Sequence, residues 1–245
     1  MKTVESRGRL RRWTLRIGTI AVGVFLVALV IGWMLYRYIP AWYQPAYVPI
    51  EDEQPARDEL GAAFTALSRG MGRGRPFDFR VKQHELNRWL VARDRIWPES
   101  KRWIPDQIQD PMILFEQDQV ILAGTWRGPG PRTVVNIRLR VEMIDDQLRV
   151  RVMSVRGGAL PIPLTPIKRQ LARLEHDRAG PDRTLLPDGT SIVDAADGAP
   201  LPKDFPWTQP RGTFRIETLK VVPGELRVRL CPMQRPPSRR SRRLR

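Results

Sequence analysis

The clearest pattern in the chain is an uninterrupted apolar stretch near its N-terminus. Residues 17–36, IGTIAVGVFLVALVIGWMLY, contain no charged side chain over 20 positions. A helix of that length spans about 30 Å, the thickness of the hydrocarbon core of a bilayer. A cleaved signal peptide usually has a shorter apolar region, about 7–15 residues, which ends in a small-x-small cleavage site. The pattern therefore predicts an uncleaved transmembrane helix.

The pattern then changes from apolar to proline-rich, and afterwards to a helical period. Four prolines lie between positions 37 and 55, which predicts an extended stalk over residues 37–55. Apolar residues recur at i, i+4 and i+7 in the segment 56–69, which predicts a first amphipathic helix. The glycines of GMGRGRP, residues 70–76, favour a flexible turn over a phosphate-binding loop, because no apolar strand precedes them.

From position 77 onward the apolar residues alternate mainly with a period of two, which is typical of strands. The segment 77–81 forms one such strand and leads directly into a second amphipathic helix over 82–94. Further strands are predicted at 111–116, 119–126, 133–144 and 147–155, with a closing hairpin over 213–232. In the two longest strands the alternation places aliphatic side chains on one sheet face and arginines on the other.

The rest of the chain completes an α+β architecture. Ile167, Leu171 and Leu174 are spaced along one helical face, which predicts a third amphipathic helix. Residues 179–210 contain six prolines and little periodicity, so we expect a long loop. The predicted fold is an N-terminal transmembrane helix followed by an antiparallel, curved β-meander that packs on two or three amphipathic helices.

The net charge of +16 is concentrated at the two ends of the chain. Residues 1–16 carry +5 and residues 235–245 carry +6, which leaves the remainder only mildly basic. We expect a basic cytoplasmic tail over 1–16 and a basic disordered tail over 233–245. The positive-inside rule then places the N-terminus in the cytoplasm and the domain 56–232 on the outer side of the cell membrane. This topology removes nucleic acid as an expected partner.

Aromatic residues gather where the predicted span leaves the membrane. All four tyrosines of the protein lie within positions 36–47, and two tryptophans lie beside them. Amphipathic rings favour the level of the lipid headgroups. The residues predicted to lie at the membrane interface are Trp33, Tyr36, Tyr38, Trp42 and Tyr43.

No pattern in the sequence indicates a catalytic or metal site. His84 and His176 are 92 positions apart, and neither belongs to a zinc-binding spacing. The chain has no GxSxG nucleophile motif, and a single cysteine cannot form an intrachain disulfide. We predict Cys231 to be a small, buried apolar residue. The expectation is a protein without enzymatic activity, cofactor or metal.

The segment FDFRVKQHELNRWL resembles the strand-then-helix opening of YpmS-like anchored bacterial envelope proteins. The domains of these proteins are similar to the tubular lipid-binding, or TULIP-like, superfamily. The segment IPDQIQDPMILFEQDQVILAGTW, the arginine-rich hairpin, and Gly158, Leu160 and Pro161 continue the same order of elements. The resemblance covers about residues 76–175, with a weaker similarity in the closing hairpin. Lys82 and Gln83 stand where such sequences often have Thr-Glu.

The resemblance implies a curved sheet that wraps a long helix and leaves an apolar groove for acyl chains. The candidate groove residues are Leu86, Trp89, Leu90, Leu122, Trp126, Ile137, Leu139 and Val150. The expected function is that of a single-pass envelope protein that binds membrane lipid, or another long apolar ligand, without catalysis. The alternative is an anchored scaffold that binds an envelope protein and holds no ligand.

Overall fold

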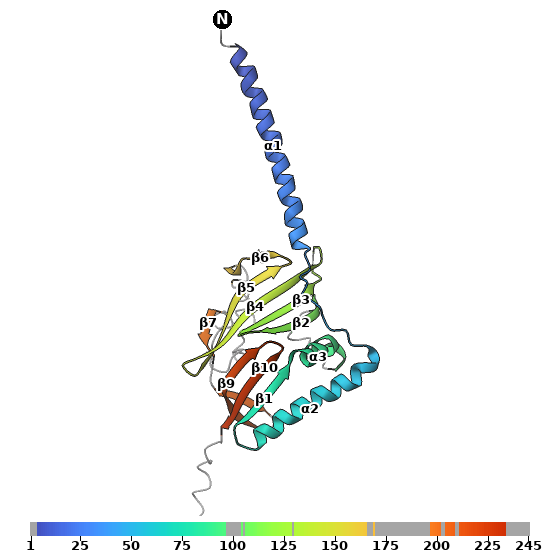
Figure 1. Ribbon diagram of the computed structural model, residues 1–245, viewed down its shortest axis with the longest axis vertical. Coiled ribbons are helices and arrows are strands. Elements are labelled where there is room, and N and C mark those ends of the chain that lie inside the picture. Colours follow the sequence, from blue (N-terminus) through green and yellow to red (C-terminus); the bar gives the residue numbers. More distant parts are fainter. Residues whose placement is uncertain are drawn as a thin grey trace, which may run out of the picture.

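The computed structural model describes residues 4–96, 104, 106–128, 130–165, 169, 197–201, 204–208 and 211–233. Within these residues, a long N-terminal helix leads into two antiparallel sheets and two shorter helices (Figure 1). The predicted α+β class and the antiparallel pairing of the strands are therefore confirmed. The predicted third helix, with Ile167, Leu171 and Leu174, lies outside the described residues.

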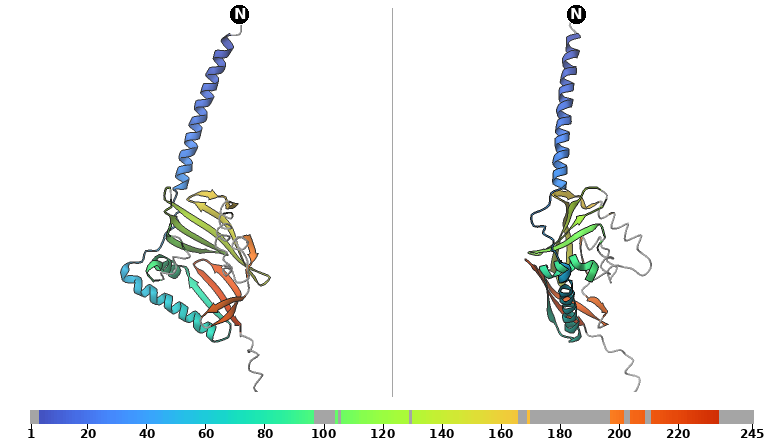
Figure 2. Two further views of the ribbon diagram at one scale, coloured as in Figure 1. Left: turned by 180° about the vertical axis from the view of Figure 1, so that it is seen from behind. Right: turned by 90° about the vertical axis from the view of Figure 1, so that its right-hand side faces the viewer.

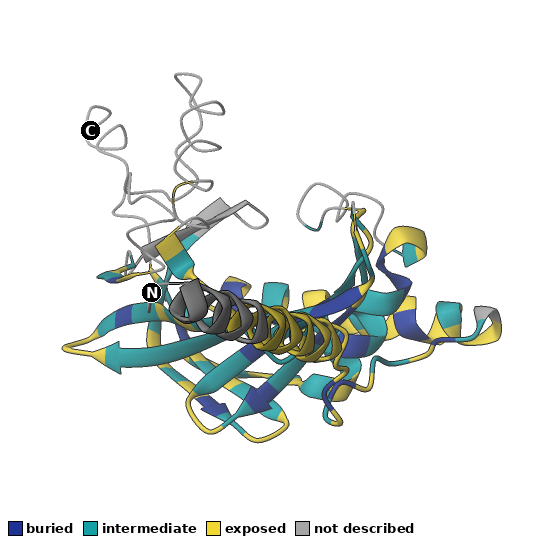
Figure 3. Cartoon of the chain, turned by 90° about the horizontal axis from the view of Figure 1, so that it is seen from above, coloured by how far each residue is buried: buried dark blue, intermediate teal, exposed yellow. Residues whose placement is uncertain are grey.

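The N-terminal helix α1 (Val4–Tyr36) contains the predicted apolar span. In the described part of the chain, residues 17–36 form the one helical segment that is long and apolar enough to cross a membrane. The helix projects away from the sheets in both views of Figure 2, and its residues from 17 onward are almost all exposed (Figure 3). An apolar surface of this size is unfavourable in water.

The segment after α1 is not a free stalk. A short 3-10 helix η1 (Ile50–Asp52) precedes α2 (Glu53–Gly72), so the predicted stalk over 37–55 ends earlier than expected. Pro55 lies in the first turn of α2, where proline is tolerated because the first N–H groups have no partner within the helix. Tyr43 and Val48 are buried against the domain.

The first sheet joins two distant parts of the chain. Its strand order is β1-β10-β9-β8, and all its pairs are antiparallel. The strands are β1 (Phe77–Lys82), β8 (Asp204–Thr208), β9 (Arg211–Val222) and β10 (Glu225–Met233). The predicted strand after position 77 and the closing hairpin are thus confirmed. They form a separate sheet, a division that the alternating pattern did not predict.

The second sheet contains the predicted meander, in the strand order β2-β3-β4-β5-β6, with β7 paired to β5. Its strands are β2 (Ile108–Glu116), β3 (Gln119–Trp126), β4 (Thr133–Ile144), β5 (Gln147–Gly157), β6 (Leu160–Ile162) and β7 (Asp197–Pro200). Asp118, Asp145 and Asp146 adopt positive φ angles in the hairpin turns. Aspartate tolerates this backbone region better than most residues, so these tight hairpin turns form although they lack the Asp-Gly pair that is common in such turns.

Three short strands were not predicted. β7 and β8 lie inside the segment 179–210, which was expected to be a loop, and β6 lies in the run expected to lead into the third helix. Each of the three contains proline, and each is only three to five residues long. Proline is tolerated in edge strands because its missing N–H can face away from the ladder. Alternation over so few residues cannot be distinguished from loop sequence.

The helix α3 (Gln83–Ile96) follows β1 without a break and lies along the open edge of β2. The Asn87 side chain accepts a hydrogen bond from the Ile113 N–H at 2.7 Å and donates to the Ile113 carbonyl at 2.9 Å. The Gln83 side-chain oxygen accepts from the Phe115 N–H at 2.9 Å. These amides satisfy backbone groups that an edge strand would otherwise expose. They hold α3 beside the six-stranded sheet.

The six-stranded sheet has two faces with different coverings. We call the face that carries Met112, Ala123 and Val134 the outer face; there Tyr43 completes a buried cluster, with Trp42 packed against it. Farther along β4 the same face carries arginines, so the predicted division into an aliphatic face and an arginine face holds only for that part. We call the opposite face, with Leu122 and Ile137, the cavity face.

Candidate functional site

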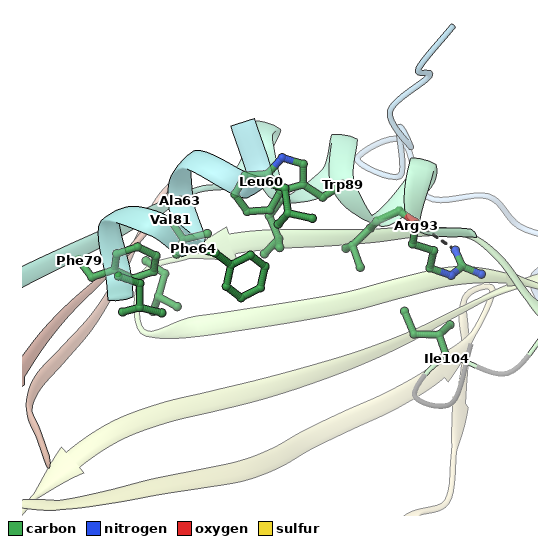
Figure 4. A pocket seen from close by; sticks show the side chains of 12 residues that line it. Leu60, Ala63, Phe64, Phe79, Val81, Trp89, Arg93 and Ile104 are labelled. Carbon is green, nitrogen blue, oxygen red and sulfur yellow. Dashed lines mark hydrogen bonds between the residues drawn. The ribbon is translucent and has the colours of Figure 1, made fainter. Parts of the chain in front are cut away.

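An apolar cavity of about 380 Å³ lies between α2, α3, β1 and β10. Its wall consists of Leu60, Ala63, Phe64, Leu67, Phe79, Val81, Leu86, Trp89, Leu90, Arg93, Ile104 and Leu226. Every one of these side chains except Arg93 is apolar or aromatic. Figure 4 shows Phe64 extending from α2 into the space, with Phe79 and Arg93 at opposite ends of the row of labelled side chains.

Two amphipathic helices and one strand build this wall from simple sequence spacings. On α2 the lining residues recur at i, i+3, i+4 and i+7, starting at Leu60. On α3 the same spacing starts at Leu86 and ends at Arg93, so an arginine occupies the last position of an apolar stripe. The strand β1 contributes alternate residues, Phe79 and Val81. The stripes of both helices therefore face one space.

The cavity is open rather than filled by its own wall. Phe64 lines it and yet remains 48% exposed, although a phenylalanine in a filled core would be almost wholly buried. Leu60, Leu67 and Leu90 are only partly buried. Apolar surface that the fold leaves accessible in a concave site is the usual feature of a binding pocket for an apolar ligand.

A second apolar cavity of about 280 Å³ adjoins the first, between α3 and the cavity face of the six-stranded sheet. It is lined by Leu90, Ile104, Ile108, Pro111, Met112, Ile113, Leu122, Ala123, Gly124, Val135 and Ile137. Leu90 and Ile104 belong to the walls of both cavities. The two spaces are therefore neighbours that meet at these two side chains.

Five of the eight predicted groove residues line these cavities. Leu86 and Trp89 line the first cavity, Leu122 and Ile137 line the second, and Leu90 lines both. The spacing of α3 and the alternation of β3 and β4 place them there. These five residues therefore lie on the helix face and the sheet face that border the two cavities.

The other three predicted groove residues, Trp126, Leu139 and Val150, line neither cavity. Trp126 is the last residue of β3 and pairs with Thr133, whose hydroxyl donates to the Tyr36 carbonyl at 2.5 Å. It therefore lies at the end of the sheet next to α1. Leu139 and Val150 share the cavity face with Ile137, but they lie farther along the strands, beyond the cavity.

The predicted membrane-interface residues separate into two groups. Trp33 and Tyr38 are exposed and Tyr36 is partly exposed, all at the end of α1 or just after it. Tyr43 is only 9% exposed, and Trp42 packs against the cluster that contains it. The Tyr43 hydroxyl donates to the Asp110 carbonyl at 2.8 Å and lies 3.0 Å from the Thr125 hydroxyl. The interface prediction is therefore wrong for Tyr43, which belongs to the domain core.

Arg93, which is not among the predicted groove residues, is the one charged residue that the described part of the chain contributes to the wall of the first cavity. It is 7% exposed, and its terminal nitrogens donate to the carbonyl oxygens of Leu90 at 3.2 Å and Ile108 at 3.3 Å. Its Nε is buried without a hydrogen-bond partner among the described residues. The nearest carboxylate oxygen, of Asp94, lies 3.7 Å from Nε. A guanidinium keeps its charge at any ordinary pH.

A polar hollow of about 340 Å³ lies on the other side of Arg93. Three carboxylates line it, those of Asp94, Asp106 and Asp110, and all three residues are exposed. Among the residues that the structure describes, no group of three or more histidine, cysteine, aspartate or glutamate side chains is arranged to hold a metal ion. Arg93 is therefore the boundary between an apolar space and a polar, solvent-accessible one.

The remaining reactive side chains stand apart from these cavities. Cys231 on β10 is partly buried; burial, followed by the nearby Glu217 carboxylate, raises the pKa of its thiol above the usual value. A thiol with a raised pKa is a weak nucleophile near neutral pH. His84 is exposed and lies 4.0 Å from the Glu85 carboxylate. Neither residue lines an apolar cavity.

Comparisons with protein-family models, curated proteins and solved structures give no match to this chain. The resemblance to YpmS-like and TULIP-like proteins therefore stays a prediction.

Proposed function

We propose that the chain is a single-pass, membrane-anchored envelope protein whose extracytoplasmic domain binds lipid acyl chains without catalysis. The observation that carries this proposal is the open cavity between α2 and α3, whose described wall residues are all apolar except for Arg93. The apolar, exposed segment 17–36 of α1 supports the membrane anchor. The basic residues that precede this segment support a cytoplasmic N-terminus.

The size and character of the cavity suit an acyl chain. Its volume of about 380 Å³ falls within the range of small-molecule sites, roughly 300–1,000 Å³. Each methylene group removed from water contributes about 0.8 kcal/mol, so even part of a chain binds favourably. The adjoining cavity of about 280 Å³ extends the apolar surface past Leu90 and Ile104 toward the sheet.

The connection between α1 and the domain supports a site that works close to the bilayer. The Ala159 N–H donates to the Leu35 carbonyl at 2.8 Å, and the Thr133 hydroxyl donates to the Tyr36 carbonyl at 2.5 Å. The turn between β5 and β6 and the first residue of β4 thus bind the last carbonyl groups of the helix, which have no partner within it. If residues 17–36 cross the membrane, the domain sits directly on its surface.

The decisive experiment measures lipid that stays bound to the full-length protein after purification in detergent. Native mass spectrometry reports the stoichiometry, and organic extraction identifies the lipid. Phe64→Asp places a charge in the cavity wall at a half-exposed position, so we expect a folded protein that loses at least about 90% of the lipid, a tenfold weaker retention. Ile144→Asp is the matched control, because Ile144 is 41% exposed and lines neither cavity.

The proposal fails if the folded wild-type protein carries no lipid and takes up none from added vesicles. That result would favour the anchored scaffold instead. Equal lipid retention by Phe64→Asp and Ile144→Asp would show that the lipid binds outside this cavity. The topology is tested separately with alkaline phosphatase fused to the C-terminus in a bacterial host, where an inactive fusion would contradict an extracytoplasmic domain.

A further inference from the structure

We infer that the ligand is an acyl chain that ends in an oxyanion, a carboxylate or a phosphate, and that Arg93 binds this head group. The inference rests on the proposed function, because it takes the cavity between α2 and α3 as the acyl-chain site. It adds the chemical class of the ligand and its direction in the cavity. The chain lies among the side chains of α2 and β1, and the head group lies at the C-terminal end of α3.

The first observation that supports the inference is the position of Arg93 at the end of an apolar stripe on α3. Leu86, Trp89, Leu90 and Arg93 occupy successive positions of one stripe on α3, and all four line the cavity. The wall exposes almost no polar atoms, so Arg93 contributes its aliphatic part to the cavity, and its guanidinium lies at one end of the wall, at the boundary with the polar hollow (Figure 4). The arrangement matches an amphiphile, which needs an apolar contact along its length and an ionic contact at one end.

The second observation that supports the inference is that Arg93, unlike two other arginines of α3, has no described carboxylate partner at hydrogen-bond distance. Arg88 donates to the Glu59 carboxylate at 3.0 Å, and Arg95 forms an ion pair with the Glu53 carboxylate at 2.6 Å. Arg93 is far more buried, yet it donates only to two backbone carbonyls, and its Nε donates to no described group. The Asp94 carboxylate at 3.7 Å from Nε is too distant for a hydrogen bond.

A buried cation without a bonded anion is costly, because removal from water is not compensated. An oxyanion at Arg93 would supply a charge-assisted hydrogen bond, the strongest kind available to a guanidinium. The carboxylates of Asp94, Asp106 and Asp110 line the same polar hollow as Arg93, but none of them accepts a hydrogen bond from its guanidinium, and its ion-pair contact, with Asp94, is 3.7 Å long. Water screens the repulsion between these exposed groups and an anionic head group.

The test uses the full-length protein in phosphatidylcholine vesicles with three photoreactive probes that share one saturated chain. The probes are the fatty acid, the corresponding uncharged alcohol and the lysophosphatidylglycerol. At about pH 8.5 the carboxyl group of the acid is ionised, because its ordinary pKa is near 4. Mass spectrometry then measures the labelling of α2 and α3 relative to that of α1. The α1 signal corrects for the different amounts of each probe in the bilayer.

We expect the acid, the lysophospholipid or both to label α2 and α3 about tenfold more than the alcohol does, as a charge-assisted hydrogen bond allows. The probe that is preferred identifies the head group as carboxylate or phosphate. Arg93→Gln should reduce the labelling by the preferred probe to that of the alcohol, whereas Arg93→Lys should retain part of the preference. Arg88→Gln, on the same helix but outside the cavity wall, should leave the preference unchanged.

Equal labelling of α2 and α3 by all three probes would overturn the head-group assignment and leave the acyl-chain site intact. A preference that survives Arg93→Gln would overturn it as well. Labelling of α2 and α3 by no probe would overturn both this inference and the proposed function. The comparison of the three probes on the wild-type protein tests the preference for a charged head group even if the Arg93 variants do not fold.

Discussion

The two faces of the six-stranded sheet carry similar apolar residues, but these residues are buried to different extents. Ile121 and Leu122 are neighbours on β3, but they point to opposite faces. Ile121, on the outer face, is 0% exposed. Leu122, on the cavity face, is only partly buried and borders an open space of about 280 Å³. The same alternation therefore places one side chain in a closed core and its neighbour beside an open space on the opposite face.

The difference lies in what the chain supplies to cover each face. On the outer face, the segment after α1 returns over the sheet and inserts Tyr43, whose hydroxyl is hydrogen-bonded as a buried polar group requires. On the cavity face, α3 lies at the edge of the sheet, and no described residue fills the space beneath Leu90. We interpret the outer face as structural and the cavity face as the site for a ligand.

The sharpest test of this contrast is a pair of adjacent alanine substitutions. Ile121→Ala should destabilise the protein by about 2–5 kcal/mol, because it leaves a new void in a closed core. Leu122→Ala should cost less than about 2 kcal/mol, since the side chain already borders a hollow and loses fewer packing contacts. Urea midpoints of the full-length protein in detergent micelles measure both effects. Equal losses would show that the cavity face is packed as tightly as the outer face.

The junction between α1 and the outer face offers a second test. Gly158 adopts a φ of +60°, and its N–H donates to the Val134 carbonyl at 2.8 Å. A Cβ atom there would clash with the carbonyl oxygens of Leu35 and Tyr36. Gly158→Ala should therefore release α1 from the sheet, with a strain of about 1–2 kcal/mol before the clash is counted.

Release of α1 should expose the chain after Arg37 to trypsin. We expect cleavage to accelerate about 5–30-fold, the factor that corresponds to 1–2 kcal/mol, when it follows the population of the open state. Gly224→Ala is the control, because Gly224 also has a positive φ, of +79°, but no atom lies near its Cβ position. An unchanged cleavage rate in Gly158→Ala would mean that the contact does not hold the domain to the helix.

The smallest expected effect concerns the hydroxyl of Tyr43. Burial raises the pKa of this group above its ordinary value of 10.0. The folded protein therefore keeps the proton to a higher pH than the unfolded chain does. The stability that this group contributes is present below pH 10.0 and is lost as the pH rises through the folded-state pKa.

Tyr43→Phe should cost about 0.5–1.5 kcal/mol at neutral pH, because a buried hydrogen bond is lost. It should also weaken the decline of stability above about pH 10, the ordinary pKa of tyrosine. Urea midpoints at neutral and alkaline pH measure both effects. Tyr47→Phe is the matched control, since Tyr47 is exposed and should show neither change. An alkaline decline of equal slope in Tyr43→Phe would assign it to another group.

The pattern of apolar residues predicted the local elements well and the spatial arrangement of the site only in part. The bounds of β3 and β4 agree with the prediction to the residue, because runs rich in aliphatic and β-branched residues end at polar or Gly/Pro-rich turn segments. Leu139 was predicted as a groove residue on the same alternation as Ile137. The extent of a cavity along a strand depends on where α3 crosses it, and alternation carries no such information.

Arg93 is a cavity residue that the sequence pattern did not predict. Its position on the stripe of α3 is visible in the sequence, as an arginine three residues after Leu90. An arginine at a helix end is usually solvated, so spacing alone did not select it. Its burial follows from the two carbonyl groups that it meets, and one of them, that of Ile108, belongs to a different element.

The sequence by itself determined the apolar helix α1, the two amphipathic helices, the alternating strands and the concentration of positive charge at the chain ends. These features depend on local spacing, on chain composition and on the cost of exposing apolar surface. Only the tertiary structure decided that the closing hairpin joins β1 in a separate sheet and that Tyr43 packs on the outer face. It also decided that Arg93 ends an open apolar cavity, because these contacts join residues far apart in the chain.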